Sequence, residues 1–468
     1  MKAIIPSFNE NSKRPYYLQL YDCIKNSILA GETSANEKLP SLRRLSKNLN
    51  LSLTTIDLAY KQLSVEGYIY SKASSGFFVS DISFAAESEY PNLNRAELDF
   101  AEGLLSEAAA HQYDLSCFDF NKWKKCLSKV LTDYPHLLLS EGDPQGEWML
   151  RSEISKYLYR SRGVAGSPSQ IVVGAGTQQI TGQLSLFLSK MSIHHVTVED
   201  PCYLPVKNIF RDRGFALTSV AVGKNGIDIK KLPTNIKSAV YVCPSNHFPT
   251  GAVMPVGRRC ELLEWANRNG SVVIEDDYDS ELRYFSKPIP ALQGLDKNGN
   301  VVYLGSFSTT LFPSIKISYM VLPKRMADMG SSFKNDYTQT CSKAEQLALA
   351  LFMQHGYYQT NIRKLRSLYS QKLQAVLNAI HLHADNFITP MNSSSGIYVI
   401  VNIMSRKSTE ALCREAHSLG LAASPVSPYL PCSDEGGGCG RPLILYYNQI
   451  PLDRIDPCMQ ALISKWQA

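Results

Sequence analysis

The first 80 residues alternate hydrophobic and polar positions in a pattern that predicts three helices followed by two short strands. Segments 16–31, 40–50 and 52–67 carry apolar residues three or four positions apart, which is the spacing of one helical face. Ser52 stands at the N-cap position of the third segment. Residues 68–79, YIYSKASSGFFV, form two β-rich runs around a turn of small residues. Three helices and a ribbon in this order predict a winged helix-turn-helix.

The turn between the second and third predicted helices is short, so the exposed N-terminal end of the third helix can enter a DNA major groove. Polar side chains occupy this end, and basic side chains that can meet backbone phosphates lie on the second helix and the ribbon. These candidate DNA-binding residues are Ser52, Thr54, Thr55, Arg43, Arg44, Lys47 and Lys72. The alternative interpretation is a small helical domain whose basic residues are solvated.

The distribution of charge favours DNA binding by this segment. The whole chain has a formal net charge of +6, and residues 1–80 hold ten Lys and Arg against six Asp and Glu. Most of the positive excess therefore lies in the segment with the winged-helix pattern.

The pattern changes twice after this segment. Residues 81–115 are acidic and small, without a sustained apolar face, and predict a linker. From residue 116 onward, short apolar runs such as 170–176 alternate with amphipathic segments such as 177–191. This alternation predicts an α/β domain over 116–468, with a mainly parallel sheet and binding groups at the carboxyl ends of its strands. The part from about residue 325 predicts a smaller α+β lobe.

Side chains that suit a phosphate ester follow two of the predicted strands. A small-residue turn after residues 170–175 leads into a helix, whose first N–H groups attract anions. Two hydroxyls and a lysine lie at the end of the predicted strand 300–306 and after it. The candidate phosphate-binding residues are Gly176, Thr177, Gln178, Ser306, Ser308 and Lys316.

Three further residues suit a pyridine ring. Asp276 ends a predicted buried strand, where a carboxylate can keep a pyridine nitrogen protonated. Tyr278 can bond an oxygen on the ring, and Tyr203 offers a face for stacking. Each residue taken singly also has a structural interpretation, such as capping, ion pairing or core packing. Their joint order favours a cofactor-like pocket.

The N-terminal segment resembles a known family. Residues 39–69, LPSLRRLSKNLNLSLTTIDLAYKQLSVEGYI, and the later SGFFV resemble the GntR-type winged-helix domain almost throughout. The resemblance implies that these residues lie at the DNA: Arg43, Thr54, Thr55 and Gly76. Leu53 departs from the family pattern, which commonly has Arg there, so one phosphate or base contact is expected to be lost or moved.

Residues 115–468 resemble the fold-type-I aminotransferase domain of the MocR/GabR regulators. The motifs GDPQGEWMLRSEISKYLYRSRGV, VGAGTQQ, VEDPCY, CPSNHFPTGAVMPVGRR, IEDDYDSELRY and YLGSFSTTLFPSIKISYMVLP occur in the order and spacing of that family. The resemblance implies the fold of a pyridoxal-phosphate-dependent transferase and a head-to-tail homodimer. Two winged-helix units on one dimer would read paired half-sites on double-stranded DNA.

One position departs from the chemistry of these relatives. The lysine that forms their Schiff base with pyridoxal phosphate falls at Thr309, whose hydroxyl cannot make an imine. Ordinary transamination needs this amine as imine partner and as proton shuttle, so the domain is expected to be inactive. Lys316 matches the family's phosphate-binding arginine. Any pyridoxal phosphate here is expected to be held non-covalently.

Two further departures concern the effector. The GabR-like pattern has arginines that engage a carboxylate, whereas this chain reads Tyr203-Leu204-Pro205 and has no arginine in 423–438. A bidentate carboxylate clamp is therefore not expected. Asn246 and His247 stand where the family usually has His and Gln.

We therefore predict a cytoplasmic DNA-binding transcriptional regulator whose aminotransferase-like domain senses a small molecule and holds a dimer. One alternative is a lysine-less enzyme dependent on pyridoxal or pyridoxamine phosphate, with His247 or Lys316 as proton carrier. Another is an architectural dimer with an empty pocket. The sequence predicts no membrane span, and its eleven cysteines, including Cys432 and Cys439, fit free thiols rather than a metal site.

Overall fold

The computed structural model describes residues 14–73, 75–81, 114–284, 289–330, 337–392, 396–426 and 440–468. The chain separates into two compact units, residues 1–108 and 109–468. Residues 82–113 of the predicted linker, and the pair Cys432 and Cys439, lie outside the described residues. Within the described residues, no helix is long and apolar enough to cross a membrane, and no cluster of three or more His, Cys, Asp and Glu could hold a metal ion.

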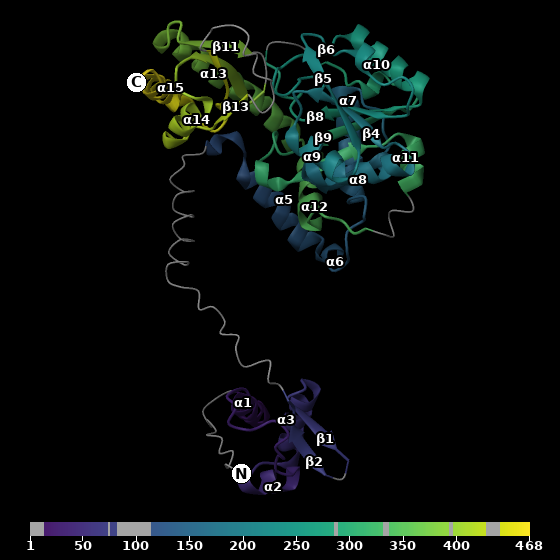
Figure 1. Cartoon of the computed structure of the whole chain (residues 1–468), viewed down its shortest axis with the longest axis vertical. Helices are drawn as coiled ribbons and strands as arrows, with labels where there is room; N and C mark the ends of the chain where they lie inside the picture. Colours follow the sequence, from purple (N-terminus) through teal and green to yellow (C-terminus); the bar gives the residue numbers. More distant parts are fainter. Residues whose placement is uncertain are drawn as a thin grey trace. The chain divides into compact units, whose positions relative to one another are not determined.

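The first unit has the predicted order of three helices and a two-stranded wing, α1 (Tyr16–Leu29), α2 (Leu42–Leu49), α3 (Leu53–Val65), β1 (Ile69–Lys72) and β2 (Gly76–Val79) (Figure 1). The wing strands pair antiparallel. The side chain of Ser52 accepts the N–H of Thr55 at 3.1 Å, which confirms the predicted N-cap of α3. The winged helix-turn-helix prediction is thereby confirmed.

Tyr60 holds the three parts of this unit together. Its fully buried ring meets Phe77 of the wing edge to face, with centroids 5.1 Å apart. Its hydroxyl donates to the carbonyl of Pro40, just before α2, at 3.0 Å. One buried side chain in the middle of α3 thus contacts both the wing and the segment before α2, within an apolar core that all three helices share.

The second unit is built on an eight-stranded sheet in the order β3-β10-β9-β8-β7-β4-β5-β6. The pairs among β5, β4, β7, β8 and β9 are parallel, whereas β10 runs antiparallel to both of its neighbours. The mainly parallel sheet is thus confirmed. The strands are β3 (Ile171–Ala175), β4 (His195–Asp200), β5 (Ala216–Gly223), β6 (Gly226–Ile227), β7 (Ala239–Val242), β8 (Val272–Asp277), β9 (Val301–Ser306) and β10 (Ile317–Val321).

Helices cover both faces of this sheet, because successive residues of its strands point to opposite sides. Val172 packs with α8, α9 and α11, whereas its neighbours Ile171 and Val173 pack with α5, α7 and α12. A third apolar cluster lies between α10 and strands β7 and β8. These helices are α5 (Phe120–Asp133), α6 (Pro135–Leu138), α7 (Trp148–Arg162), α8 (Gly176–Lys190), α9 (Leu204–Asp212), α10 (Val256–Asn269), α11 (Lys324–Met329) and α12 (Lys343–Gln354).

Strands β5 and β6 were not predicted from the sequence. They lie at one edge of the sheet, where a strand is covered less than in the middle. In β5, Val220 is the one buried residue, and Thr218 and Ser219 interrupt its apolar positions. Short 3₁₀ helices complete the unit: η1 (Leu115–Cys117), η2 (Pro168–Gln170), η3 (Ile229–Lys231), η4 (Gln293–Leu295), η5 (Pro313–Ile315) and η7 (Leu452–Arg454).

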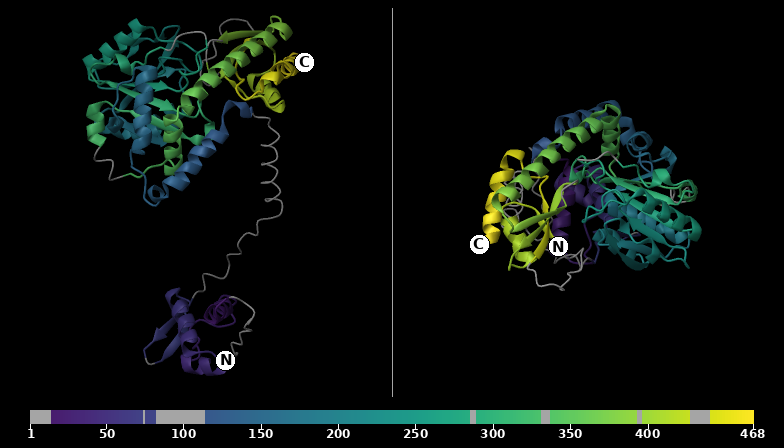
Figure 2. Two further views of the ribbon diagram at one scale, coloured as in Figure 1. Left: turned by 180° about the vertical axis from the view of Figure 1, so that it is seen from behind. Right: turned by 90° about the horizontal axis from the view of Figure 1, so that it is seen from above.

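The smaller lobe has an antiparallel sheet in the order β11-β12-β14-β13, covered by helices on one side. Helix α12 lies within the region predicted for this lobe but packs in the core of the large one, and the long helix α13 then runs from one core to the other (Figure 2). The elements are α13 (Tyr357–His383), β11 (Ile388–Asn392), β12 (Tyr398–Met404), α14 (Thr409–Ser418), β13 (Ala423–Pro425), β14 (Gly440–Tyr446) and α15 (Ile455–Gln467).

A buried ion pair joins Asp114 to the smaller lobe. The ammonium of Lys372, in the middle of α13, lies 2.6 Å from the carboxylate of Asp114 and donates to the carbonyl of Asn448 at 2.7 Å. Burial alone would raise the pKa of Asp114, but the hydrogen bonds from Lys372 and Ser116 hold it below its usual value. Asp114, which directly precedes η1, is thereby anchored to the smaller lobe.

Replacing Lys372 should show how much its ion pair with Asp114 contributes to the free energy of unfolding. Lys372→Met leaves the Asp114 carboxylate buried without its partner, so we expect the free energy of unfolding to fall by about 3 kcal/mol. Urea unfolding of the full-length protein measures the change. Lys364→Met, at an exposed position of the same helix, is the control and should change the value by less than about 0.5 kcal/mol. Equal effects of the two substitutions would contradict the prediction.

Candidate functional site

The candidate DNA-binding residues of the first unit lie on α2, at the start of α3 and on the wing. Arg43, Arg44 and Lys47 are exposed on α2. Ser52 and Thr54 are exposed at the N-terminal end of α3, whereas Thr55 is half-buried and bonds its hydroxyl to that of Ser52 at 2.8 Å. The N-terminal end of α3 therefore presents hydroxyl groups to the solvent, and α2 presents cationic side chains.

The wing carries a second cationic group. The ammonium of Lys72 lies 4.8 Å from the ring centre of Phe78, and that of Lys38 lies 5.9 Å from the same ring. Lys38 reaches the wing because it forms an isolated β-bridge with Phe78. Gly76 opens β2 with φ +107, and a Cβ there would lie 3.5 Å from the Lys38 side chain. Sequence reasoning missed Lys38, since the bridge links positions far apart in the chain.

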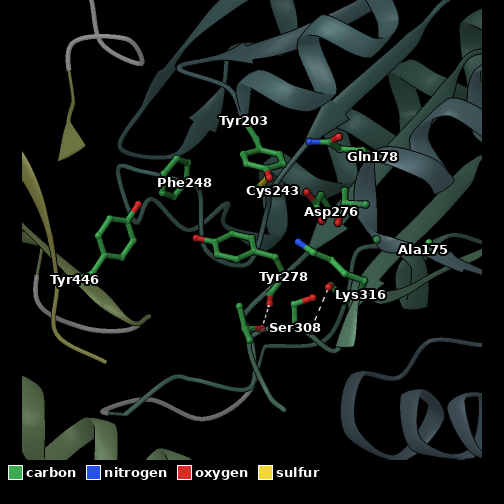
Figure 3. A pocket seen from close by; sticks show the side chains of 14 residues that line it. Ala175, Gln178, Tyr203, Cys243, Phe248, Asp276, Tyr278, Ser308, Lys316 and Tyr446 are labelled. Atoms are coloured by element: carbon green, nitrogen blue, oxygen red, sulfur yellow. Dashed lines mark hydrogen bonds between the residues drawn. The ribbon is translucent and has the colours of Figure 1, made fainter. Parts of the chain in front are cut away.

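Every residue predicted for the cofactor-like pocket lines one cavity of the second unit, with a volume of about 460 Å³. They come from the start of α8, the end of β8, the start of α9 and the segments after β9 and η5 (Figure 3). Four lining residues were not predicted: Ala175, Cys243, Phe248 and Tyr446. Ala175 is the last residue of β3 and Cys243 directly follows β7, whereas the small-lobe residue Tyr446 carried no signal in the sequence.

One end of the pocket is rich in hydrogen-bond donors. Gly176, with φ +84, turns the chain from β3 into α8, so the first N–H groups of a 15-residue helix meet the cavity. Ser306 already accepts hydrogen bonds from the N–H of Ser308 and the hydroxyl of Ser318, at 3.3 and 3.0 Å. Among the described residues nothing accepts the hydrogen of Ser306 itself, which is therefore available to a ligand oxygen.

Lys316 supplies the cation at this end. It is the one charged donor among the described residues that line the cavity, and none of those residues pairs with its ammonium. The side chain points toward the space between Asp276 and Tyr278 (Figure 3). Its backbone adopts φ +48, an uncommon conformation for a residue with a side chain.

Asp276 is the one carboxylate that lines the cavity within the described part of the chain. It accepts a hydrogen bond from the hydroxyl of Tyr241 in the adjacent strand β7. Burial raises the pKa of Asp276 to about 6, although the Tyr241 hydrogen bond works in the opposite direction. A protonated ring nitrogen placed here would find an acceptor that burial has made strongly basic for a carboxylate.

Thr309 faces the cavity from the segment after β9. Its hydroxyl donates to the backbone carbonyl of Tyr278 at 2.6 Å, and this bond ties the segment to the end of β8. Thr309 therefore both lines the pocket and holds the segment after β9 against the Tyr278 carbonyl.

The other end of the pocket is aromatic. Tyr203, Phe248, Tyr278 and Tyr446 line it, and Phe248 packs edge to face on Tyr278 with centroids 6.3 Å apart. Among the described residues that line the cavity, none is an arginine. Tyr446 comes from β14 of the smaller lobe, so the cavity is lined by both lobes.

His247, which the enzyme alternative used as proton carrier, does not line the cavity. Both of its ring nitrogens have partners, the Thr250 hydroxyl at 2.8 Å and the Pro201 carbonyl at 3.0 Å. Burial lowers the pKa of His247 to about 4 and raises that of the adjacent Glu199 to about 8. Their contact at 3.5 Å is therefore between neutral groups near pH 7. Asn246 is also off the cavity and donates to both oxygens of Asp279 at 2.9 Å.

Both units match known families. Residues 16–79 match the model of bacterial regulatory proteins of the gntR family, and residues 118–431 match aminotransferase class I and II. Among solved structures, the chain is similar to a kynurenine aminotransferase of Pyrococcus horikoshii, with TM-score 0.64, 22% identity and coverage of 76% of this chain and 89% of that one. The α-aminoadipate aminotransferase LysN of Thermus thermophilus gives TM-score 0.64, 23% identity and coverage of 76% and 90%.

Relatives share both units in one chain. The uncharacterized HTH-type transcriptional regulator YdeL of Bacillus subtilis is 37% identical over 91% of this chain and 92% of its own length. The probable rhizopine catabolism regulatory protein MocR of Rhizobium meliloti is 29% identical over 88% and 87%. The pyridoxine biosynthesis regulator PdxR of Corynebacterium glutamicum is 28% identical over 92% of both chains.

A gntR-type winged helix joined to an aminotransferase fold defines a class of transcriptional regulators in which a DNA-binding unit precedes an enzyme-like domain. The chain belongs to the aminotransferase class I and II family and is a DNA-binding HTH-type transcriptional regulator of the MocR type.

The buried Glu199 predicts a pH dependence of stability. Its pKa of about 8 in the folded state exceeds the usual value of about 4.3, so folded protein keeps a proton that unfolded protein releases. The free energy of unfolding should therefore fall as pH rises from 6.5 to 8, by up to about 1.4 kcal/mol per unit from this group. His247 titrates below this window. Glu199→Gln, measured by urea unfolding, should reduce the slope, and Glu264→Gln on the exposed face of α10 should not.

Proposed function

We propose that the aminotransferase-like domain of this regulator is a ligand sensor and dimerisation unit without catalytic activity. One observation carries the proposal: the cavity combines a phosphate-type donor end, a buried Asp276 and an aromatic end, yet Thr309 stands where the Schiff-base lysine of the resembled family would be. The hydroxyl of Thr309 is bonded to the Tyr278 carbonyl and cannot form an imine.

Pyridoxal phosphate or a close analogue fits the remaining groups. The first N–H groups of α8 with Ser306 and Lys316 would hold its phosphate, Asp276 would accept from its ring nitrogen, and Tyr203 would face its ring. When bound covalently in an aminotransferase, this cofactor supplies an electron sink for amine chemistry. In this chain the groups can bind and orient the ring, but no described amine stands at position 309 to accept and return a proton.

The regulatory output is proposed to be a change in DNA binding. Two winged-helix units on a head-to-tail homodimer would engage paired half-sites, with spacing limited by the linker. A ligand that binds one arrangement of the dimer more tightly than another would then change the fraction of protein that can bind DNA. A cytoplasmic location follows from this role as a DNA-binding protein.

The two alternatives have less support. The enzyme alternative loses one of its two proton carriers, since His247 lies off the cavity with both nitrogens bonded. The architectural alternative predicts a pocket that binds nothing, whereas unpaired Lys316 and the free hydrogen of Ser306 suit an anionic ligand.

Restoring the amine tests the pocket directly. In Thr309→Lys, the new amine should condense with the aldehyde of added pyridoxal phosphate, with loss of water, and give a visible absorbance band that borohydride removes. Thr309→Met, of similar length without an amine, is the matched control. A borohydride-sensitive band in the unmodified protein would contradict the proposal, as would a Thr309→Lys protein that stays colourless with pyridoxal phosphate in excess.

The DNA-binding assignment predicts a change in salt dependence. Arg43→Ala should weaken binding to a duplex selected from a random library by about five- to tenfold, and lower the slope of log affinity against log salt by about one. Fluorescence anisotropy at several salt concentrations measures both. Arg268→Ala, at an exposed position of α10 in the other unit, is the control. An unchanged slope in Arg43→Ala would remove this residue from the DNA contact.

A further inference from the structure

The hydrogen bond of Thr309 restricts what this side chain can offer a ligand. A hydroxyl has one hydrogen, and a backbone carbonyl can only accept. In the 2.6 Å bond between Thr309 Oγ1 and the carbonyl of Tyr278, the hydrogen must therefore come from Thr309. Thr309 also lines the cavity, and there its oxygen has only lone pairs to offer a ligand. Thr309 is thus an acceptor for any ligand group beside it.

The resemblance to aminotransferases indicates which ligand group this is. Thr309 stands at the position of the lysine that bonds the carbon attached to ring position 4 of pyridoxal phosphate. The natural forms of this cofactor differ at that carbon: the aldehyde of pyridoxal phosphate accepts hydrogen bonds, whereas the amine and the alcohol of pyridoxamine and pyridoxine phosphates donate them. An aldehyde oxygen beside Thr309 would place two hydrogen-bond acceptors in contact. An amine or an alcohol there would instead donate a hydrogen bond to the Thr309 oxygen.

The other polar groups of the cavity would meet parts of the ligand that all three forms share. Asp276 would meet the ring nitrogen and Tyr278 the ring oxygen, and Ser306 and Lys316 with the first N–H groups of α8 would meet the phosphate. The lysine that would compensate an aldehyde by forming a covalent bond is absent at 309. The difference in affinity among the forms is therefore concentrated at Thr309.

We propose that this pocket selects a pyridine phosphate with a hydrogen-bond donor at the position 4 substituent, and binds pyridoxamine 5′-phosphate in preference to pyridoxal 5′-phosphate. The inference rests on the proposed sensing function of the pocket and specifies its ligand. The ammonium of the amine form makes a charge-assisted bond and is favoured over the neutral alcohol. The regulator then responds to the aminated form of the ligand, which the lysine-bearing pockets of transaminases produce and consume during turnover.

Four probes that differ at one substituent test this selection. Full-length protein, dialysed free of ligand, is titrated by calorimetry with pyridoxamine, pyridoxine, pyridoxal and 4-deoxypyridoxine 5′-phosphates. The amine form should bind about tenfold more tightly than the aldehyde form, with the alcohol form between them and the methyl form no tighter than the aldehyde. Equal or tighter binding of the aldehyde overturns the inference, as does an aldehyde adduct on Lys316 after borohydride treatment.

Two variants assign the selection to the Thr309 oxygen. In Thr309→Val a methyl group replaces the hydroxyl and keeps the Tyr278 carbonyl covered, so the preference for the amine form should shrink to less than about twofold. Thr309→Ser keeps the hydroxyl and should keep the preference. A preference that survives in Thr309→Val overturns the inference but leaves the sensing function standing. Absence of binding by all four probes to the unmodified protein overturns both.

Discussion

Three consecutive carboxylates, Glu275, Asp276 and Asp277, are buried at the end of β8. Their partners come from α7, β7, β9 and the start of η4. A buried carboxylate is costly unless it is hydrogen-bonded, paired or protonated. Because side chains of a strand alternate, Asp276 faces the cavity while its two neighbours face the other side of the sheet. The hydrogen-bond and ion-pair partners of these carboxylates therefore come from different elements on the two faces of the sheet.

The far side of the sheet satisfies Glu275 and Asp277. Glu275 accepts the backbone N–H groups of Leu292 and Gln293 at 2.7 and 2.8 Å. Asp277 pairs with the buried Arg162 from the end of α7 at 2.8 Å and accepts from the Tyr303 hydroxyl at 2.6 Å. These bonds fix the end of β8 from both flanks. Asp276, between them, is therefore held toward the ligand by contacts that lie outside the pocket.

The elements with strong local patterns were predictable from the sequence. The central strands β7 and β9 are nearly continuous apolar runs, β8 opens with three apolar residues, and the caps of the winged helix are local hydrogen bonds. Edge strand β5 and the packing of α12 on the large lobe were missed, because both depend on neighbours distant in the chain. In the pocket, the residues that belong to sequence motifs at or after strand ends were predicted. Tyr446 and Tyr241 were not, since their roles arise when strands from separate regions are brought together.

The cavity draws its lining from two lobes, and this arrangement has a mechanical consequence. Tyr446 is carried by β14 of the smaller lobe, whereas Asp276 and the donor end belong to the large one. A ligand that contacts both would join the two lobes non-covalently. Helix α13 contributes residues to the apolar cores of both lobes, so it is a second, covalent link between the parts that such a ligand would join.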